Sequence, residues 1–174
     1  FANVIETRSG VVFVDPILAL MPPADHTWII FGIIYPAILI ALLMNWKRPE
    51  KLLVFIQTYT MMLFFRAIAM SLLPLEAPAG IIVLTDPLVE FFSTEKPLTK
   101  DLFFSGHTST MYILYLTLAG KKTKPLFALG TFIVFTLILW QHVHYTIDIL
   151  AAFFFSYGCY RIVVNFQRSV FKLH

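Results

Sequence analysis

Five long apolar runs constrain the fold of this chain more than any other feature. Each run is close to the ~20 residues that a helix needs to cross the hydrocarbon core of a bilayer. The runs span residues 27–44, 52–73, 102–120, 125–143 and 145–164. Hydrophobic residues make up 59% of the 174 residues, against about half in a soluble domain. The pattern excludes a soluble globular protein and predicts one embedded in a membrane.

The fold class that follows is an all-α integral membrane protein with a bundle of five visible transmembrane helices. Residues 1–26 precede the bundle and contain no apolar run of spanning length. Because prolines interrupt this segment, we expect an interfacial helix with proline-marked ends there. Residues 27–164 form the transmembrane domain, and residues 165–174 form a short tail.

The basic residues indicate which end of the bundle faces the cytoplasm. The turns at one end carry nine lysines and arginines, and those at the other end carry three, with Arg66 inside an apolar run. The more basic end faces the cytoplasm under the positive-inside rule. We therefore expect a cytoplasmic C-terminus and place residues 101–107 and 144–148 on the extracytoplasmic side, in a periplasm or a lumen.

Composition also narrows the classes of partner and cofactor. The net charge of +3 comes from scattered loop residues, with no basic stripe of the kind that binds nucleic acid. Cys159 is the single cysteine, so no internal disulfide can form. The chain shows no Cys/His spacing typical of zinc. We expect the bilayer and its lipids as partners, no nucleic acid, no metal and no cofactor, and the sequence leaves a homo-oligomer open.

Four ionisable side chains are expected at similar depth near the extracytoplasmic surface. Arg66 lies seven residues before the end of the second run, which is roughly 10 Å of helix. His107 lies in the first turns of the third run, and His144 and Asp148 begin the fifth. A charge inside a bilayer costs at least ~2.5–3.5 kcal/mol, so these groups need partners or a wet cavity. Three helices therefore contribute to one polar site.

The spacing of these residues suits chemistry on a phosphate. His144 and Asp148 stand at i and i+4, so the carboxylate can orient one imidazole nitrogen and leave the other as a nucleophile or base. Ser105 and Gly106 precede His107 at the expected start of a helix, where free N–H groups favour an anion. Arg66 would add a bidentate fork to a phosphate.

Other interpretations of the same residues stay open at this point. A buried polar cluster can serve only to fix helix packing. Ser105 with His144 could instead form an intramembrane serine hydrolase, although that leaves His107 and Arg66 without a role. A non-catalytic lipid-binding or assembly protein with this fold is the third reading.

Two motifs resemble a known family. The run from Asp101 through Ser105-Gly106-His107 and the run His144-Tyr-Thr-Ile-Asp148 are similar to those of the lipid phosphatase (PAP2) superfamily, in its sphingomyelin-synthase-related branch. The resemblance implies a core of six helices and a phosphohistidine mechanism. Since five spans are visible, we expect the sixth helix either before Phe1 or replaced by residues 1–26.

Site roles also follow from the resemblance. It implies that His144 is the nucleophile, that Asp148 orients it and that His107 is the general acid and base. Arg66, Ser105 and Gly106 would bind the phosphate. By position the polar cluster would also include two carboxylates, Asp101 and Glu76.

The chain departs from the phosphatase pattern in a way that bears on the substrate. A second arginine is missing before the histidine of the fifth run, where Thr136 and Leu137 stand, and Tyr59 occupies the place of a lysine before Arg66. A phosphomonoester dianion needs several cations, whereas one arginine suffices for a phosphodiester. We therefore expect a phospholipid donor and a lipid alcohol acceptor, such as ceramide or diacylglycerol. Water as the acceptor would instead make the protein a phospholipase C or a phosphatase.

Overall fold

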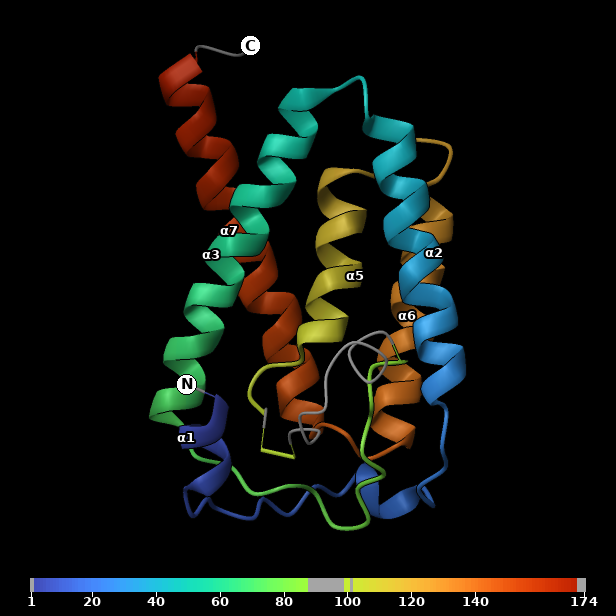
Figure 1. The fold of residues 1–174 in the computed structure, drawn as a ribbon, viewed down its shortest axis with the longest axis vertical. Helices are drawn as coiled ribbons and strands as arrows, with labels where there is room; N and C mark the ends of the chain where they lie inside the picture. The colour runs from blue at the N-terminus through green and yellow to red at the C-terminus, as the bar shows by residue number, and fades with distance from the viewer. Residues whose placement is uncertain (1, 88–98, 101, 172–174) are drawn as a thin grey trace.

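The computed structural model describes residues 2–87, 99–100 and 102–171. In these residues the regular secondary structure is helical, apart from an isolated bridge between Val11 and Leu75. Five helices form the bundle in Figure 1: α2 (Thr27–Asn45), α3 (Pro49–Leu72), α5 (Gly106–Thr117), α6 (Lys124–Trp140) and α7 (Thr146–Phe171). A short helix α1 (Ala2–Thr7) and a 3-10 turn η1 (Leu18–Leu20) precede them. The predicted all-α class is confirmed.

Three of the helices are long and apolar enough to cross a membrane. They are α2, α3 and α7, and α6 is a shorter apolar helix. Large apolar side chains on these helices stay exposed, among them Leu43, Phe64 and Phe154. Since an exposed apolar face of this extent is compatible with lipid rather than water, the chain is an integral membrane protein.

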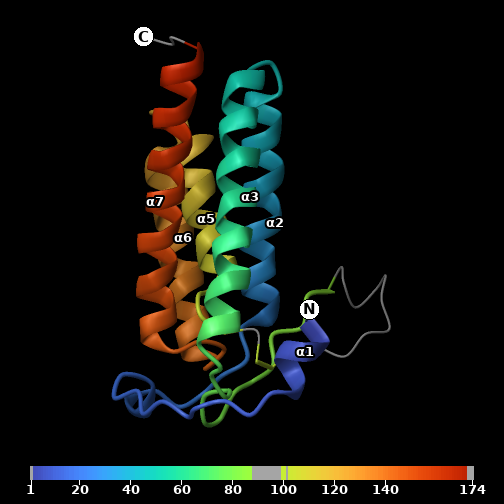
Figure 2. The same cartoon turned by 90° about the vertical axis from the view of Figure 1, so that its left-hand side faces the viewer.

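The shortest bundle helix, α5, lies at the centre. It packs against α2, α3, α6 and α7 (Figures 1 and 2). Ile113 and Leu114 have no exposed surface, and Met111 has almost none. Because the other helices surround α5, its first turn is held in the middle of one end of the bundle. That turn carries Gly106 and His107.

The helix boundaries differ from those expected from hydropathy. The third span was expected to start at residue 102, but α5 begins at Gly106, because the backbone of Phe104 and Ser105 bonds to other helices. The fourth span was expected to reach residue 143, but α6 ends at Trp140, and His142 has a positive φ of 56°. The last helix runs beyond the expected residue 164, to Phe171.

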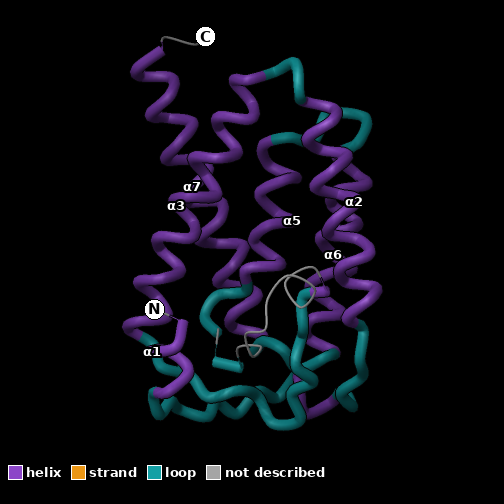
Figure 3. Tube along the Cα trace, viewed as in Figure 1, coloured by secondary structure: helices purple, strands orange, loops and turns teal. Residues whose placement is uncertain are grey.

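Residues 8–26 form a strap across the end of the bundle at which α5 begins (Figures 2 and 3). The expectation of an interfacial helix here was wrong, since most of this N-terminal strap is irregular. Its backbone bonds to other segments instead: the Val11 N–H donates to the Pro74 carbonyl, and Val11 accepts from the Glu76 N–H. Further along, the Ala24 N–H donates to the Trp140 carbonyl. The strap thereby connects the ends of α3 and α6.

Candidate active site

His107 and His144 line one small cavity where the α3–α5 connection, the first turn of α5 and the α6–α7 connection meet. Its volume is about 60 Å³. The rest of its lining is mostly apolar: Ile81, Leu84, Thr99, Leu102 and Val143. Phe31 packs against His107 in an edge-to-face arrangement, with the two ring centroids 5.5 Å apart. The structure therefore brings the two histidines of separate motifs to one enclosed space.

His144 is oriented by Asp148. Its Nδ1 lies 3.3 Å from Asp148 Oδ2, and that oxygen also accepts the Tyr145 N–H at 3.1 Å. His144 precedes the first turn of α7 rather than standing on the helix, so Asp148 reaches back to the helix start as an acidic residue of a capping box does. Asp148 is fully buried, and its Oδ1 has no hydrogen-bond partner among the residues that the structure describes. With Nδ1 on the carboxylate, Nε2 is the ring nitrogen left for chemistry.

Arg66 reaches from α3 to the start of α5. Its Nε donates to the Phe104 carbonyl at 2.7 Å. The guanidinium lies against Gly106, where an added Cβ would stand 3.4 Å from Cζ and 3.5 Å from Nε. A glycine at this position lets the cation approach the first turn of a helix, where backbone N–H groups face outward. A positive charge and a helix N-terminus therefore lie side by side next to His107.

Ser105 is the N-cap of α5 and is completely buried. Its Oγ accepts the Thr108 N–H at 3.4 Å, and its carbonyl accepts from the Ser109 hydroxyl at 2.8 Å. The Ser105 N–H donates to the Asp148 carbonyl at 3.3 Å, which joins the two motifs directly. These bonds give Ser105 a structural task in shaping the site.

Asp15 holds the start of α7 from the strap, and the sequence reasoning missed it. Its Oδ2 accepts the Thr146 N–H at 2.6 Å, and its Oδ1 accepts the Thr146 hydroxyl and the N–H groups of Ile17 and Leu18. Burial alone would raise the Asp15 pKa, but these hydrogen bonds outweigh it and hold the pKa below its usual value. Since 131 residues separate Asp15 from Thr146, no local pattern announces the contact.

The remaining candidates lie away from the histidine cavity or outside the described residues. Asp101 lies outside them. The Glu76 carboxylate accepts from Lys100 Nζ at 2.9 Å and from the Gly10 N–H at 2.8 Å. The hydrogen bond from Lys100 is the main cause that lowers the Glu76 pKa. The ion pair joins two parts of the α3–α5 connection, and the hydrogen bond from Gly10 ties the strap to it, so Glu76 has a supporting role outside the cavity.

His142 and Gln141 serve the loops rather than the cavity. The two ring nitrogens of His142 each lie 2.9 Å from a backbone carbonyl, Nδ1 from Ala79 and Nε2 from Met21. The Gln141 amide donates to the Thr27 hydroxyl and to the Ile82 carbonyl. Within the described residues no group of three His, Cys, Asp or Glu side chains is placed to hold a metal ion.

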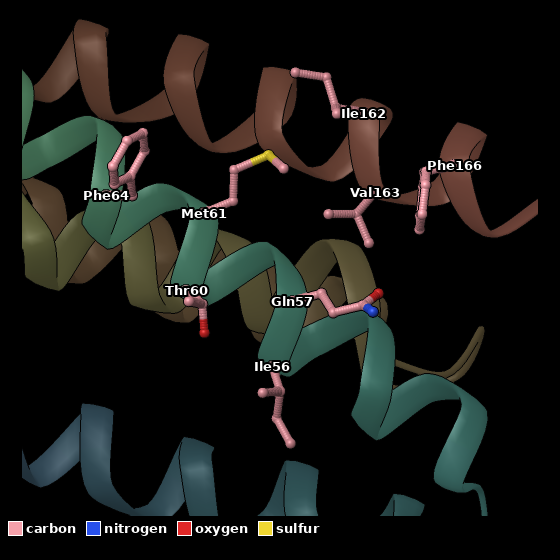
Figure 4. A pocket seen from close by; sticks show the side chains of 8 residues that line it. All are labelled: Ile56, Gln57, Thr60, Met61, Phe64, Ile162, Val163 and Phe166. Atoms are coloured by element: carbon pink, nitrogen blue, oxygen red, sulfur yellow. The ribbon is translucent and has the colours of Figure 1, made fainter.

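A larger cavity lies away from the candidate active site. It measures about 610 Å³ and lies between α3 and α7. Figure 4 shows its lining, which is mostly apolar, with Gln57 and Thr60 as the polar members. None of its lining residues titrates, and exposed side chains such as Phe64 and Phe166 border it. A cavity of this kind suits lipid chains, and the titratable groups lie at the smaller one.

Comparison with known proteins gives one match. Residues 100–165 match the family model described as PAP2 superfamily C-terminal. The matched region contains His107, His144 and Asp148 but not Arg66. Comparisons with curated proteins and with solved structures gave no significant match. This match supports a relation of the chain to the PAP2 superfamily. At the level of the superfamily it also supports a membrane enzyme of the lipid-phosphatase type, which is a phosphoesterase that acts on lipids.

Proposed function

We propose that this protein transfers a phosphate-linked head group from a phospholipid to a lipid alcohol, through a phosphohistidine at His144. The observation that carries the proposal is the cavity that His107 and His144 share, with Asp148 on the far nitrogen of His144. Two imidazoles on one enclosed space suit a displacement at phosphorus, in which one attacks and the other moves the proton.

The first half-reaction forms the covalent intermediate. Nε2 of His144 attacks the phosphorus of the donor, and the bond between phosphorus and the diacylglycerol oxygen breaks. His107, as the imidazolium, gives its proton to that oxygen, so neutral diacylglycerol leaves. Asp148 stabilises the positive charge that forms on His144. Arg66 and the N–H groups at the start of α5 face the phosphate oxygens.

The second half-reaction returns both histidines to their first state. The acceptor hydroxyl gives its proton to His107 while its oxygen attacks the phosphorus. The bond between phosphorus and Nε2 then breaks, and the head group leaves on the new lipid. The same residue acts as acid and then as base, as microscopic reversibility requires.

The charge at the site favours a phosphodiester over a phosphomonoester. Among the described residues, Arg66 is the cation that lies against the start of α5, and Lys100 is bound to Glu76. One arginine matches the single charge of a phosphodiester. Four of the seven lining residues, Ile81, Leu84, Leu102 and Val143, are apolar, which favours a lipid alcohol such as ceramide or diacylglycerol as the acceptor. This chemistry is that of the sphingomyelin-synthase-related branch.

The test uses the purified full chain in lipid nanodiscs. Phosphatidylcholine or phosphatidylethanolamine with a labelled head group is supplied, with and without ceramide or diacylglycerol, and products are followed by mass spectrometry. We expect the label to appear on the added lipid alcohol. Release of a free phosphorylated head group without acceptor would identify a phospholipase C, and release of inorganic phosphate a phosphatase.

Matched variants test the assignment of the nucleophile. His144→Ala should abolish both turnover and the acid-labile phosphoryl label on the protein. His142→Ala removes a histidine two residues away that faces backbone carbonyls, so the label should persist. Ser105→Ala should also keep the label. Loss of the label in Ser105→Ala, together with a label that persists in His144→Ala, would instead favour a serine nucleophile. Wild-type turnover by His144→Ala would overturn the proposed mechanism.

A further inference from the structure

A cavity lined by cations lies at the end of the bundle opposite the histidines. Its volume is about 270 Å³, and it sits between the end of α2 and the turn that joins α5 to α6. The charged side chains that line it are Arg48, Lys121 and Lys122, and no carboxylate is among its described lining residues. We refer to these three residues as the basic triad. A cavity with this lining is suited to an anion.

The walls of this cavity are fixed by hydrogen bonds. Asn45 is 2% exposed, and its Nδ2 donates to the carbonyls of Ala41 at 2.8 Å and Leu118 at 2.9 Å, so it ties the end of α2 to the end of α5. The turn that carries both lysines is closed by the Gly120 N–H on Thr123 Oγ1 at 3.0 Å and by the Lys124 N–H on the Gly120 carbonyl at 2.8 Å. The triad is therefore held on a defined framework.

The triad is not neutralised from within the described part of the chain. The ion pairs found there involve Lys100 with Glu76 and His144 with Asp148, both at the other end. Glu50, the nearest acidic residue in sequence, lines a different cavity beside Lys51 and Arg168. Three like charges around one cavity repel each other, so a bound anion stabilises this arrangement.

The exposed side chains at and beside this cavity are of the kind found at a bilayer surface. Met44 lines it and is 45% exposed, and the neighbouring Trp46 is 72% exposed. Exposed tryptophans of this kind gather at the membrane–water interface. If the bound anion is a lipid head group, its acyl chains can lie along the exposed side of α2. A free anion has no such chains and would leave this apolar surface uncovered.

We propose that the basic triad binds the phosphate head group of an anionic phospholipid in the leaflet opposite the candidate active site. The positive-inside count makes this the cytoplasmic leaflet, whose anionic lipids attract basic segments. The site is separate from the histidine cavity, so it can be occupied whatever reaction the histidines perform. Its role is to anchor the α2–α3 and α5–α6 turns to the membrane surface.

The test is lipid retention by the full chain in native mass spectrometry. The protein is purified in detergent with a mixture of phosphatidic acid and phosphatidylcholine, and we expect wild-type protein to retain one phosphatidic acid in preference to phosphatidylcholine. Arg48→Gln with Lys121→Gln and Lys122→Gln should weaken that retention by about 100-fold, the loss expected for removing three cations from an anionic surface. Added salt should weaken it in wild-type protein.

A charge-matched control separates the cavity from the general charge of this end. Lys47→Gln with Lys124→Gln and Arg168→Gln removes the same charge, and none of these residues lines the cavity. This control should retain the lipid. Lys121→Gln with Lys122→Gln changes two exposed turn residues only, so a weaker loss is measurable even if Arg48 matters for folding.

Two results would overturn the inference. Equal loss in the triad variant and the control would show that the surface charge as a whole attracts the lipid. Displacement of phosphatidic acid by an equal concentration of inorganic phosphate would show that the cavity takes a free phosphate and not a lipid.

Discussion

Asp15 shows how one residue in the strap can set the position of the candidate nucleophile. Its carboxylate accepts from both the N–H and the hydroxyl of Thr146, two residues after His144. The first turn of α7 and the His144–Asp148 contact therefore depend on a side chain from the other end of the sequence. This role is one of positioning, because Asp15 is not part of the histidine cavity.

We predict that Asp15→Ala lowers stability by about 1–2 kcal/mol, the usual cost of losing an N-cap. Because the folded-state pKa of Asp15 is held below the ordinary value of about 3.9, its contribution is present above that pH and is lost as pH falls through the lowered pKa. Thermal unfolding in detergent at several pH values measures this. Asp15→Asn should show a smaller fall at acid pH than wild-type protein, and an equal fall would contradict the assignment.

Arg66 is the second residue whose side chain links distant parts of the site. Its Nε donates a hydrogen bond to the Phe104 carbonyl, so the guanidinium is held beside the start of α5 before any substrate binds. A preorganised cation costs little to align when a phosphate binds. Arg66 should therefore act mainly on the binding of the phosphate and its transition state.

We predict that Arg66→Ala lowers kcat/KM by about 10- to 100-fold, the effect of losing a hydrogen bond to a charged group worth about 1.5–3 kcal/mol. Arg66→Lys should recover only part of this, since a lysine has no planar fork. Steady-state kinetics on the labelled donor lipid measure both. Arg161→Ala, at an exposed position on α7, is the control, and an unchanged kcat/KM in Arg66→Ala would exclude the arginine from the site.

Among the structural elements, the strap depends on close backbone approach at Gly10. A Cβ there would lie 2.5 Å from the carbonyl carbon of Leu75 and 2.7 Å from the Glu76 nitrogen. The Gly10 N–H also donates to the Glu76 carboxylate. The Tyr145 hydroxyl then joins the strap to α7, since it accepts the Phe13 N–H and donates to the Glu76 carbonyl.

We predict that Gly10→Ala loosens the strap, because its new methyl group would collide with backbone that cannot move aside. Limited proteolysis should cut residues 8–26 faster in this variant than in wild-type protein, and turnover should fall as the start of α7 loses support. Ser9→Ala, at an exposed neighbouring position, is the control. Unchanged proteolysis in Gly10→Ala would mean that the strap tolerates a side chain at this contact.

The sequence anticipates the helices better than it anticipates their ends. The second helix is expected over residues 27–44 and observed as Thr27–Asn45, because lipid-facing helices are set by composition over a full span. The start of α5 cannot be read in this way. Ser105 gives its N–H to the Asp148 carbonyl, and Phe104 gives its carbonyl to Arg66, so distant partners prevent an earlier start.

The same distinction applies to the candidate site. The spacing predicts the pairing of His144 with Asp148, although His144 lies before α7 and Asp148 reaches back to it from the first turn. The proximity of Arg66 to Gly106 follows from matching depths in two helices. Asp15 and the pairing of Glu76 with Lys100 could not be anticipated, because both depend on the path of irregular segments. Hydropathy and periodicity contain no information on that path.

At the scale of the whole molecule, charge divides the bundle into two unlike ends. The described carboxylates at the histidine end include Asp15, Asp25, Glu76 and Asp148, while Glu50 is the described carboxylate at the other end. The basic triad and most other cations lie at that other end, together with the last turns of α7 (Figure 1). Such an asymmetry in lysine and arginine determines the orientation of a membrane protein in the bilayer.

We predict that the histidine end faces away from the cytoplasm. Lys122→Cys places a thiol in the α5–α6 turn, and Asp25→Cys places one in the strap; both positions are exposed. The native Cys159 is buried, so it should label slowly. In sealed, intact cells a membrane-impermeant maleimide should modify Asp25→Cys and spare Lys122→Cys, and opening the membrane should make Lys122→Cys reactive. The opposite pattern would put the histidines on the cytoplasmic side, and the anionic lipid of the basic triad in the outer leaflet.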